Sequence, residues 1–206
     1  MIAEKIKLRS DIDLNDQNHG LVKLCEVLRS INVPYYLSNG ALLGAIREKD
    51  FIRWDWDVQI NLKTEDVYSR KDELRAAFEN AGFKIIRMDH TYKNLKYLLG
   101  NYNTLYELTA WHLKGNMRYR RDWKLPSKFF DSPQFVKLRG HNYPVMSPPE
   151  EYLSYVYGDW KTPKRTDDKK VYYNSSYFRH KRLWRFLLLF SVLKEKIAER
   201  LNLSMS

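Results

Sequence analysis

YYLSNGALLGAIREKDFIRWDWDV occupies residues 35–58 and contains the most informative order of elements in the chain. A short β-prone run at residues 35–37 leads into a turn of small and polar residues at 38–40, and helical character resumes over residues 41–47. A turn between a strand and a helix exposes backbone N–H groups that can bind a phosphate. The segment therefore predicts a strand, a tight turn and a helix, with an anion site at the turn.

Two acidic residues follow this helix on a second predicted strand. Residues 54–62 alternate in character, which places Asp55, Asp57 and Gln59 on one face. Carboxylates separated by one residue on a strand lie roughly 7 Å apart at the backbone and can share divalent ions, and Mg²⁺ prefers oxygen ligands. An Asp-x-Asp pair by itself is more often two solvated acids on a strand edge. The turn upstream shifts the balance towards a metal site.

The composition favours a folded protein with an anionic partner. The 206 residues include 36 Lys and Arg against 25 Asp and Glu, a formal net charge of +11, and 44% of them are hydrophobic. This content is too apolar for a disordered chain and too polar for an integral membrane protein, and the length fits one domain. The charge is compatible with a nucleotide, a nucleic acid, a polyanionic glycan or an anionic membrane surface.

Neither a membrane span nor a secretion signal is expected from the sequence. The longest apolar stretch, residues 183–193, is far shorter than the roughly 20 residues of a spanning helix, and the N-terminus has no apolar signal core. The single cysteine, Cys25, excludes an internal disulfide and a cysteine-rich zinc site. We therefore expect a cytoplasmic protein, whose basic C-terminal segment permits peripheral contact with an anionic membrane.

Periodicity and turn residues predict elements on both sides of the central segment. Apolar residues at helical spacing predict helices at residues 21–31, from Thr64 as N-cap to Ala81, and from Ser147 to the residue before Gly158. Strands are predicted at residues 84–86, 97–99, 104–113, 135–138 and 143–146. An apolar stripe at 183–201, preceded by basic residues, predicts a C-terminal basic amphipathic helix. The fold class is α+β, one domain with a helical tail.

Two segments of the chain resemble the LicD/fukutin family. Residues 35–58 are similar to that family's Gly-Thr-Leu-Leu-Gly-Ala-x-Arg helix followed by a Trp-Asp-x-Asp strand. The segment YLSYVYGDWKTP, residues 152–163, is similar to its leucine–tyrosine–glycine–aspartate helix terminus. The resemblance implies a nucleotidyltransferase-like domain at residues 1–163, with a mixed β-sheet flanked by helices. A basic linker and C-terminal helix at residues 164–206 would then pack on the domain or on a membrane surface.

The resemblance also implies an activity. It is that of a Mg²⁺-dependent transferase, with Mn²⁺ as an alternative metal. The enzyme would move a phospho-alcohol, such as phosphocholine or a polyol phosphate, from a CDP-activated donor to a sugar hydroxyl, with release of CMP. The acceptor would be a surface glycan or glycolipid such as lipopolysaccharide. Donor and acceptor are then the expected partners, and no nucleic acid is expected.

The family's site residues can be carried over to matching positions. Asp55 and Asp57 become the metal-binding catalytic acids, and Glu107 is the best third carboxylate, on a β-like stretch where the family places an acid. Its alternative is a surface Glu on a strand. The residues expected to bind substrate are Ser38, Asn39, the turn glycine Gly40, Arg47 at the end of the motif helix, Gln59, Arg118 and Arg120. For Arg118 and Arg120 a solvated basic loop is the alternative.

Three departures from the family pattern leave other functions open. Gln59 stands where the family usually has another acid, Ala41 replaces a hydroxyl residue of the phosphate turn, and Arg53 replaces a proline. The related nucleotidyltransferase pattern is acid, apolar residue, acid, which would place the metal pair at the Asp57 and Gln59 positions. A neutral amide oxygen binds Mg²⁺ more weakly than a carboxylate does. Either Asp55 and Asp57 carry the metal, or the site has lost catalytic power and the chain is a glycan- or membrane-surface-binding adaptor. A nucleic-acid binder that uses the basic tail is the third hypothesis.

Overall fold

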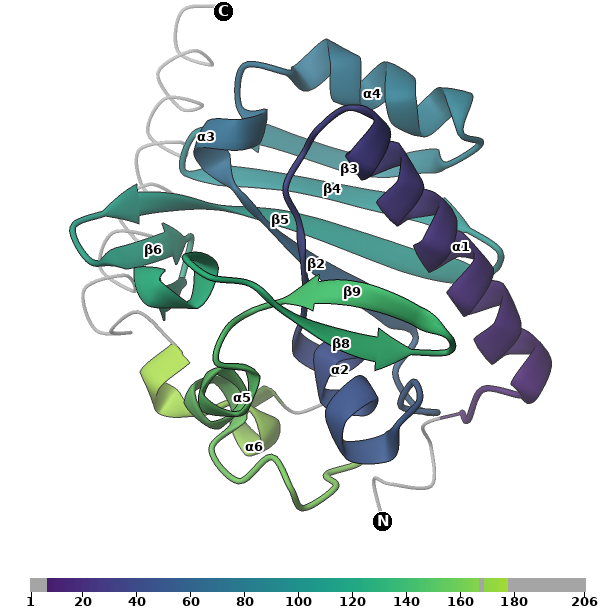
Figure 1. Cartoon of the computed structure of the whole chain (residues 1–206), viewed down its shortest axis with the longest axis vertical. Helices are drawn as coiled ribbons and strands as arrows, with labels where there is room; N and C mark the ends of the chain where they lie inside the picture. The colour runs from purple at the N-terminus through teal and green to yellow at the C-terminus, as the bar shows by residue number, and fades with distance from the viewer. Residues whose placement is uncertain (1–6, 167–168, 178–206) are drawn as a thin grey trace, which may run out of the picture.

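The computed structural model describes residues 7–166 and 169–177, which form a sheet with helices packed around it (Figure 1). The strands are β1 (Tyr36–Ser38), β2 (Asp57–Lys63), β3 (Lys84–Thr91), β4 (Asn94–Asn101), β5 (Thr104–Lys114), β6 (Met117–Arg120), β7 (Trp123–Pro126), β8 (Gln134–Leu138) and β9 (His141–Val145). The α-helices are α1 (Asp11–Ser30), α2 (Asn39–Leu43), α3 (Thr64–Val67), α4 (Lys71–Asn80), α5 (Pro149–Tyr157) and α6 (Lys169–Tyr172). Shorter turns are the π-helical η2 (Gly44–Glu48) and the 3-10 turns η3 (Ser127–Phe130) and η4 (Ser175–Tyr177).

The sheet mixes parallel and antiparallel pairs. Its nine strands include seven in the order β3-β4-β5-β2-β1-β9-β8, while β6 pairs with β5 and β7 off this path. Strand β2 runs parallel to β5 and antiparallel to β1, and β1 runs parallel to β9. The remaining neighbours are antiparallel hairpins. A mixed sheet flanked by helices confirms the predicted fold class.

The central position of β2 brings distant residues into one row. Gln59 on β2 pairs with Ser38 of β1 on one side and with Glu107 of β5 on the other. The acid motif enters β2 at Asp57, which pairs with Leu105. Residues that the sequence separates by more than sixty positions therefore meet where β2 begins.

Helices α1 and α4 bury an apolar stripe against the sheet. Their fully buried side chains include Leu14, Leu21, Leu24, Leu28, Leu74 and Phe78. Burial of a side chain of this size stabilises the fold by about 1.5–3 kcal/mol relative to exposure. Gly20 lets α1 approach β5 closely, because a Cβ at this position would lie 2.0 Å from the Tyr106 hydroxyl. That hydroxyl donates to the Gln17 carbonyl at 3.0 Å and ties β5 to α1.

Helix α2 follows β1 directly and packs against α5. The helix predicted over residues 41–47 is confirmed, although its second half is the π-helical turn η2. Asn39 starts α2 with a φ of +47°, and its Oδ1 accepts a hydrogen bond from the Tyr152 hydroxyl at 2.5 Å. Gly158 ends α5 with a φ of +68°, as predicted for the second family segment. The two segments that resemble the family therefore contact each other.

Two segments differ from what the sequence pattern favours. The helix expected from Thr64 to Ala81 is broken into α3 and α4, and the residues that precede them, rather than Thr64, hold the N-cap positions. The break lets Arg70 donate to the Ile31 carbonyl at the end of α1, at 2.5 Å. The basic segment around Arg118 and Arg120 is a hairpin of β6 and β7 rather than a solvated loop, because β-prone residues flank a turn in which Arg121 has a φ of +47°.

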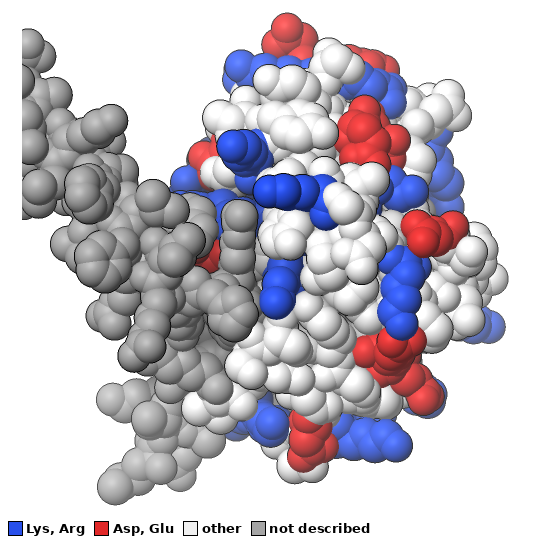
Figure 2. Space-filling view, turned by 90° about the vertical axis from the view of Figure 1, so that its left-hand side faces the viewer, with Lys and Arg blue, Asp and Glu red and all other residues white. Residues whose placement is uncertain are grey.

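The C-terminal part of the chain is only partly described. Residues 183–201, predicted as the final helix, lie outside the described residues. Short elements α6 and η4 pack back on the domain, where Tyr177 is buried and η4 contacts α5 and β7. Among the described helices, none combines the length and the apolar character that crossing a bilayer requires. On the face drawn in Figure 2, blue and red side chains alternate with uncharged surface over the described atoms.

Candidate active site

Asp55 and Asp57 converge where β2 begins. Asp57 is the first residue of β2, whereas Asp55 lies in a turn closed by a hydrogen bond from its backbone N–H to the Ile52 carbonyl, at 2.9 Å. Both carboxyl groups line one cavity, and Asp57 is close enough to raise the pKa of Asp55. The expectation that one strand carries both acids is wrong, because this turn, and not the pleat of β2, sets the direction of Asp55.

The surroundings of Asp55 disfavour its charged form. Burial is the main cause and the charge of Asp57 is the second, and together they raise the pKa of Asp55 well above its usual range. The Arg9 guanidinium acts in the opposite direction. A divalent cation bound between two such carboxylates would remove their mutual repulsion.

Gly40 makes room for the Asp55 carboxylate at the start of α2. A Cβ built on Gly40 would lie 1.8 Å from Asp55 Oδ2, far inside van der Waals contact. The glycine is therefore required by the close approach of the acid rather than by its own backbone conformation. This contact joins the turn at the start of the motif to the acids at its end.

Asp57 lies where two cavities meet, and Asp55 lines the first of them. The first arm of this cleft, a cavity of about 160 Å³, is lined by residues that include Gly40, Arg47, Asp55, Asp159 and Lys164. The second arm, of about 390 Å³, is lined by residues that include Asn39, Lys96, Glu107, Arg120, Trp123 and Tyr177. Both arms are lined by Asp57, Gln59, Tyr172 and Tyr173. Most of the predicted site residues are thus brought to one cleft.

Glu107 lies in the second arm but not in one cluster with the acid pair. Its Oε2 is 2.5 Å from Lys96 Nζ, and its Oε1 is 3.6 Å from Arg120 Nη1. Within the described ranges, no three His, Cys, Asp or Glu side chains are gathered closely enough to hold a metal ion. Two cationic side chains already pair with this carboxylate, so the role of Glu107 as a third metal ligand stays a prediction.

The polar side chains of the turn and of the motif helix form hydrogen bonds with other parts of the protein. Ser38 is fully buried, and its Oγ donates to the Gln59 carbonyl at 3.1 Å. The Asn39 side chain is held by α5, as described above. Arg47 donates to the Trp160 carbonyl at 3.0 Å and pairs with Glu48 at 2.7 Å, while still lining the first arm. The structure therefore leaves Arg47 facing the cleft but ties Ser38 to β2.

The two predicted arginines of β6 have different surroundings. Arg118 is only 5% exposed, donates to the Trp111 carbonyl at 2.9 Å and forms a two-pronged ion pair with Glu65 of α3. Neither partner lines the cleft, so the predicted substrate contact of Arg118 is not supported by its position. Arg120 does line the second arm, and burial lowers the pKa of its guanidinium.

Several cleft residues were missed by sequence reasoning. Lys96 lies on β4, where a lysine on an amphipathic strand ordinarily faces water. Tyr172 and Tyr173 come from the segment that the sequence predicts as a basic linker, and the adjacent pair of aromatic residues is the signal that points to them. Asp159 belongs to the second family segment, residues 152–163, and lines the first arm. These residues reach the cleft only through tertiary packing.

A comparison with models of protein families identifies the family of this chain. A sequence model described as "LicD/FKTN/FKRP, nucleotidyltransferase domain" matches residues 32–146, which is more than half of the chain. The chain belongs to this family. The match contains the turn, the acid pair, Glu107 and Arg120, and it confirms the family resemblance and the nucleotidyltransferase-like fold.

Known relatives match this LicD/FKTN/FKRP chain either over a short segment or at low sequence identity. The mouse and human proteins named "Ribitol 5-phosphate transferase FKRP" are each 45% identical over 51 residues, which is 25% of this chain and 10% of theirs. The chain thus spans about a tenth of the length of these curated relatives. The solution structure of the antibiotic-resistance factor ANT(2'')-Ia covers 77% of this chain and 80% of its own, with a TM-score of 0.51 and 16% identity. At that identity the likeness concerns the fold alone.

Proposed function

We propose that the chain is a LicD-type phosphotransferase that moves a phospho-alcohol from a CDP-activated donor to a sugar hydroxyl of a surface glycan or glycolipid. The observation that carries the proposal is the convergence of Asp55 and Asp57 against Gly40, inside a cleft, in a member of this family. A fold hosts many functions, so the fold by itself would not distinguish transfer from binding. Two acids directed at one point of a cleft favour transfer.

The acid pair fits Mg²⁺ or Mn²⁺. Mg²⁺ in proteins is commonly held by one or two carboxylates, with water and substrate phosphates completing its shell. Asp55 and Asp57 supply two such groups, and a bound cation would offset the charge of Asp57 that disfavours ionisation of Asp55. When bound, the ion would supply neutralising charge to the donor diphosphate.

Phosphoryl transfer depends mainly on positioning and charge neutralisation. The acceptor hydroxyl attacks the phosphorus that carries the alcohol, the bond from this phosphorus to the CMP oxygen breaks, and the hydroxyl proton passes to a cleft carboxylate. Arg47 lines the first arm and Arg120 lines the second, so each can contact phosphate oxygens of a donor bound in the cleft. Tyr172 and Tyr173 give both arms aromatic walls that suit a base or a sugar ring.

A donor screen tests the proposal directly. The purified chain is incubated with CDP-ribitol, CDP-glycerol, CDP-choline or CDP-ethanolamine and a glycan acceptor, and CMP release is measured with and without Mg²⁺ or Mn²⁺. We expect metal-dependent release with a preferred donor, and a loss of about a hundredfold or more in Asp57→Asn, because charge stabilisation in the transition state is removed. Equal release by the variant and the parent would contradict the assignment.

A second candidate function is a non-catalytic adaptor for a glycan or a membrane surface. It is favoured by Gln59 in place of an acid and by the engagement of Glu107 with Lys96 and Arg120. These features leave two acids where related sites have more. Calorimetric titration with CDP in the presence of Mg²⁺ separates the candidates, since the adaptor predicts no metal-dependent nucleotide binding.

A further inference from the structure

Arg9 lies behind the acid pair and donates hydrogen bonds to the segment that carries it. Arg9 is only 2% exposed, although arginine residues in folded proteins are mostly exposed. Nε donates to the Asp55 carbonyl at 3.1 Å, and Nη2 donates to the Trp56 carbonyl at 2.8 Å. Nη1 donates to Thr104 Oγ1 at 3.0 Å, at the start of β5. The guanidinium also lies over the Trp56 ring, 4.4 Å from its centre.

The carbonyls that Arg9 contacts lie just outside the strand ladder. Pairing of β2 with β5 starts at Asp57 and Leu105, so the two preceding peptides have no partner strand. A buried carbonyl without a donor costs free energy comparable to a lost hydrogen bond. The planar fork of Arg9 supplies donors to both carbonyls at once, in a geometry that a lysine ammonium does not reproduce.

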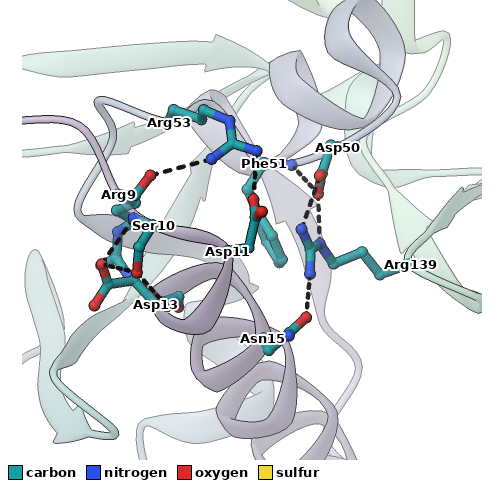
Figure 3. Close-up of polar contacts among 9 residues, drawn as sticks. All are labelled: Arg9, Ser10, Asp11, Asp13, Asn15, Asp50, Phe51, Arg53 and Arg139. Carbon is teal, nitrogen blue, oxygen red and sulfur yellow. Dashed lines mark hydrogen bonds and ion pairs between the residues drawn. The ribbon is translucent and has the colours of Figure 1, made fainter.

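Arg9 is itself fixed by the same loop. Its backbone N–H donates to the Arg53 carbonyl at 2.7 Å, and its carbonyl accepts from Arg53 Nη1 at 3.2 Å. Figure 3 shows Arg53 reaching this carbonyl and Asp11, next to the capping box of Ser10 and Asp13 that starts α1. The N-terminal segment is therefore hydrogen-bonded to the acid loop, residues 50–56 before β2.

We propose that Arg9 is a positioning residue that sets the direction of Asp55 and Asp57 by holding the two peptide groups between them. The inference rests on the proposed function, because the direction of the acids matters when they bind a metal ion. The tolerance is small, since Asp55 Oδ2 occupies space that is free only because Gly40 has no side chain. A rotation of the Asp55 peptide would move the carboxylate out of this space and away from Asp57. Arg9 lies outside residues 32–146, so the family match does not include it.

The test compares two buried arginines. Arg9→Gln removes the guanidinium behind the acids, and Arg118→Gln removes a similarly buried guanidinium that donates to a backbone carbonyl away from the cleft. Mg²⁺ and Mn²⁺ affinities are measured by calorimetry, together with melting temperatures. We expect Arg9→Gln to weaken metal affinity by about 10- to 100-fold, the usual effect of removing a group that orients a ligand. Arg118→Gln should lower the melting temperature without changing metal affinity.

Arg9→Lys keeps the charge and loses the fork, so it also serves if Arg9→Gln does not fold. Because a lysine leaves at least one of the two carbonyls without its donor, we expect both its melting temperature and its metal affinity to lie between those of the parent and Arg9→Gln. Parental affinity in a folded Arg9 variant would overturn the positioning role and leave the proposed function intact. If the parent itself binds neither Mg²⁺ nor Mn²⁺, the proposed function fails, and the positioning role fails with it.

Discussion

At the scale of single residues, the cleft is defined by what each carboxylate contacts. Asp55 and Asp57 face each other, and the raised pKa of Asp55 follows from burial and from its neighbour. Glu107 instead faces Lys96 and Arg120. A carboxylate between two cations orients those cations as much as they orient it. The three acids that the sequence groups together therefore have two different environments.

Glu107→Gln distinguishes a metal ligand from a group that orients Arg120. Because the acid already has two cationic partners, we expect the substitution to leave Mg²⁺ affinity within about twofold of the parent, unlike removal of a metal ligand. The KM for the CDP-activated donor should rise, since Arg120 loses the partner that holds it in the second arm. Calorimetry and initial-rate kinetics measure the two effects. A large loss of metal affinity would instead support the third-ligand role.

At the scale of elements, the loop before β2 is held by contacts with two separate parts of the chain. The segment before α1 pairs with it through Arg9 and Arg53, as described above. On the other side, Arg139 in the turn between β8 and β9 forms an ion pair with Asp50, with 2.5 Å between Nε and Oδ1 (Figure 3). The same guanidinium donates to Asn15 of α1 at 2.6 Å. One hairpin turn thus connects the acid loop to the first helix.

The ion pair of Asp50 and Arg139 predicts a pH-dependent contribution to stability. The hydrogen bond from Arg139 holds the pKa of Asp50 below its usual value, so the contribution is present above that value and is lost as the pH falls through the folded-state pKa. Because the pair is partly exposed, Asp50→Asn should lower the free energy of unfolding at pH 7 by only about 0.5–1 kcal/mol. Denaturant unfolding across pH should show this difference shrinking in acid. A difference that persists there would contradict the ionic origin.

At the scale of the whole molecule, the site is formed by segments from most of the described chain. One cleft is lined by residues of the turn after β1, of the start of β2, and of β4, β5 and β6, together with residues from the segments 157–166 and 172–177. Ligands that bind such a site link these segments and stabilise the folded state more than the unfolded chain. Binding of a divalent ion should therefore be visible as global stability.

Metal addition gives a prediction at this scale. At a concentration of Mg²⁺ or Mn²⁺ about a hundred times the dissociation constant, binding to the folded state should add about 2.7 kcal/mol to the free energy of unfolding. The melting temperature should rise accordingly and return to its starting value with a chelator. Asp57→Asn should show no rise, because it removes one of the two carboxylates. A rise of equal size in the variant would place the ion elsewhere on the molecule.

The local features of the fold were determined by the sequence. The strand, turn and helix at residues 35–47 and the hairpins at Tyr102-Asn103 and Arg139-Gly140 follow from periodicity and turn chemistry. These properties act between near neighbours in the chain, so a pattern of residues is enough to express them.

The partners of each charged side chain were decided by the tertiary structure. Glu107 meets Lys96 and Arg120 because β4, β5 and β6 pair in a particular register, and Arg118 turns to α3 for the same reason. Arg9 reaches the acid loop only because its segment pairs with residues near Arg53. Contacts between segments far apart in the chain depend on strand order and helix packing. No local pattern distinguishes an arginine that will face water from one that will hold two carbonyls in place.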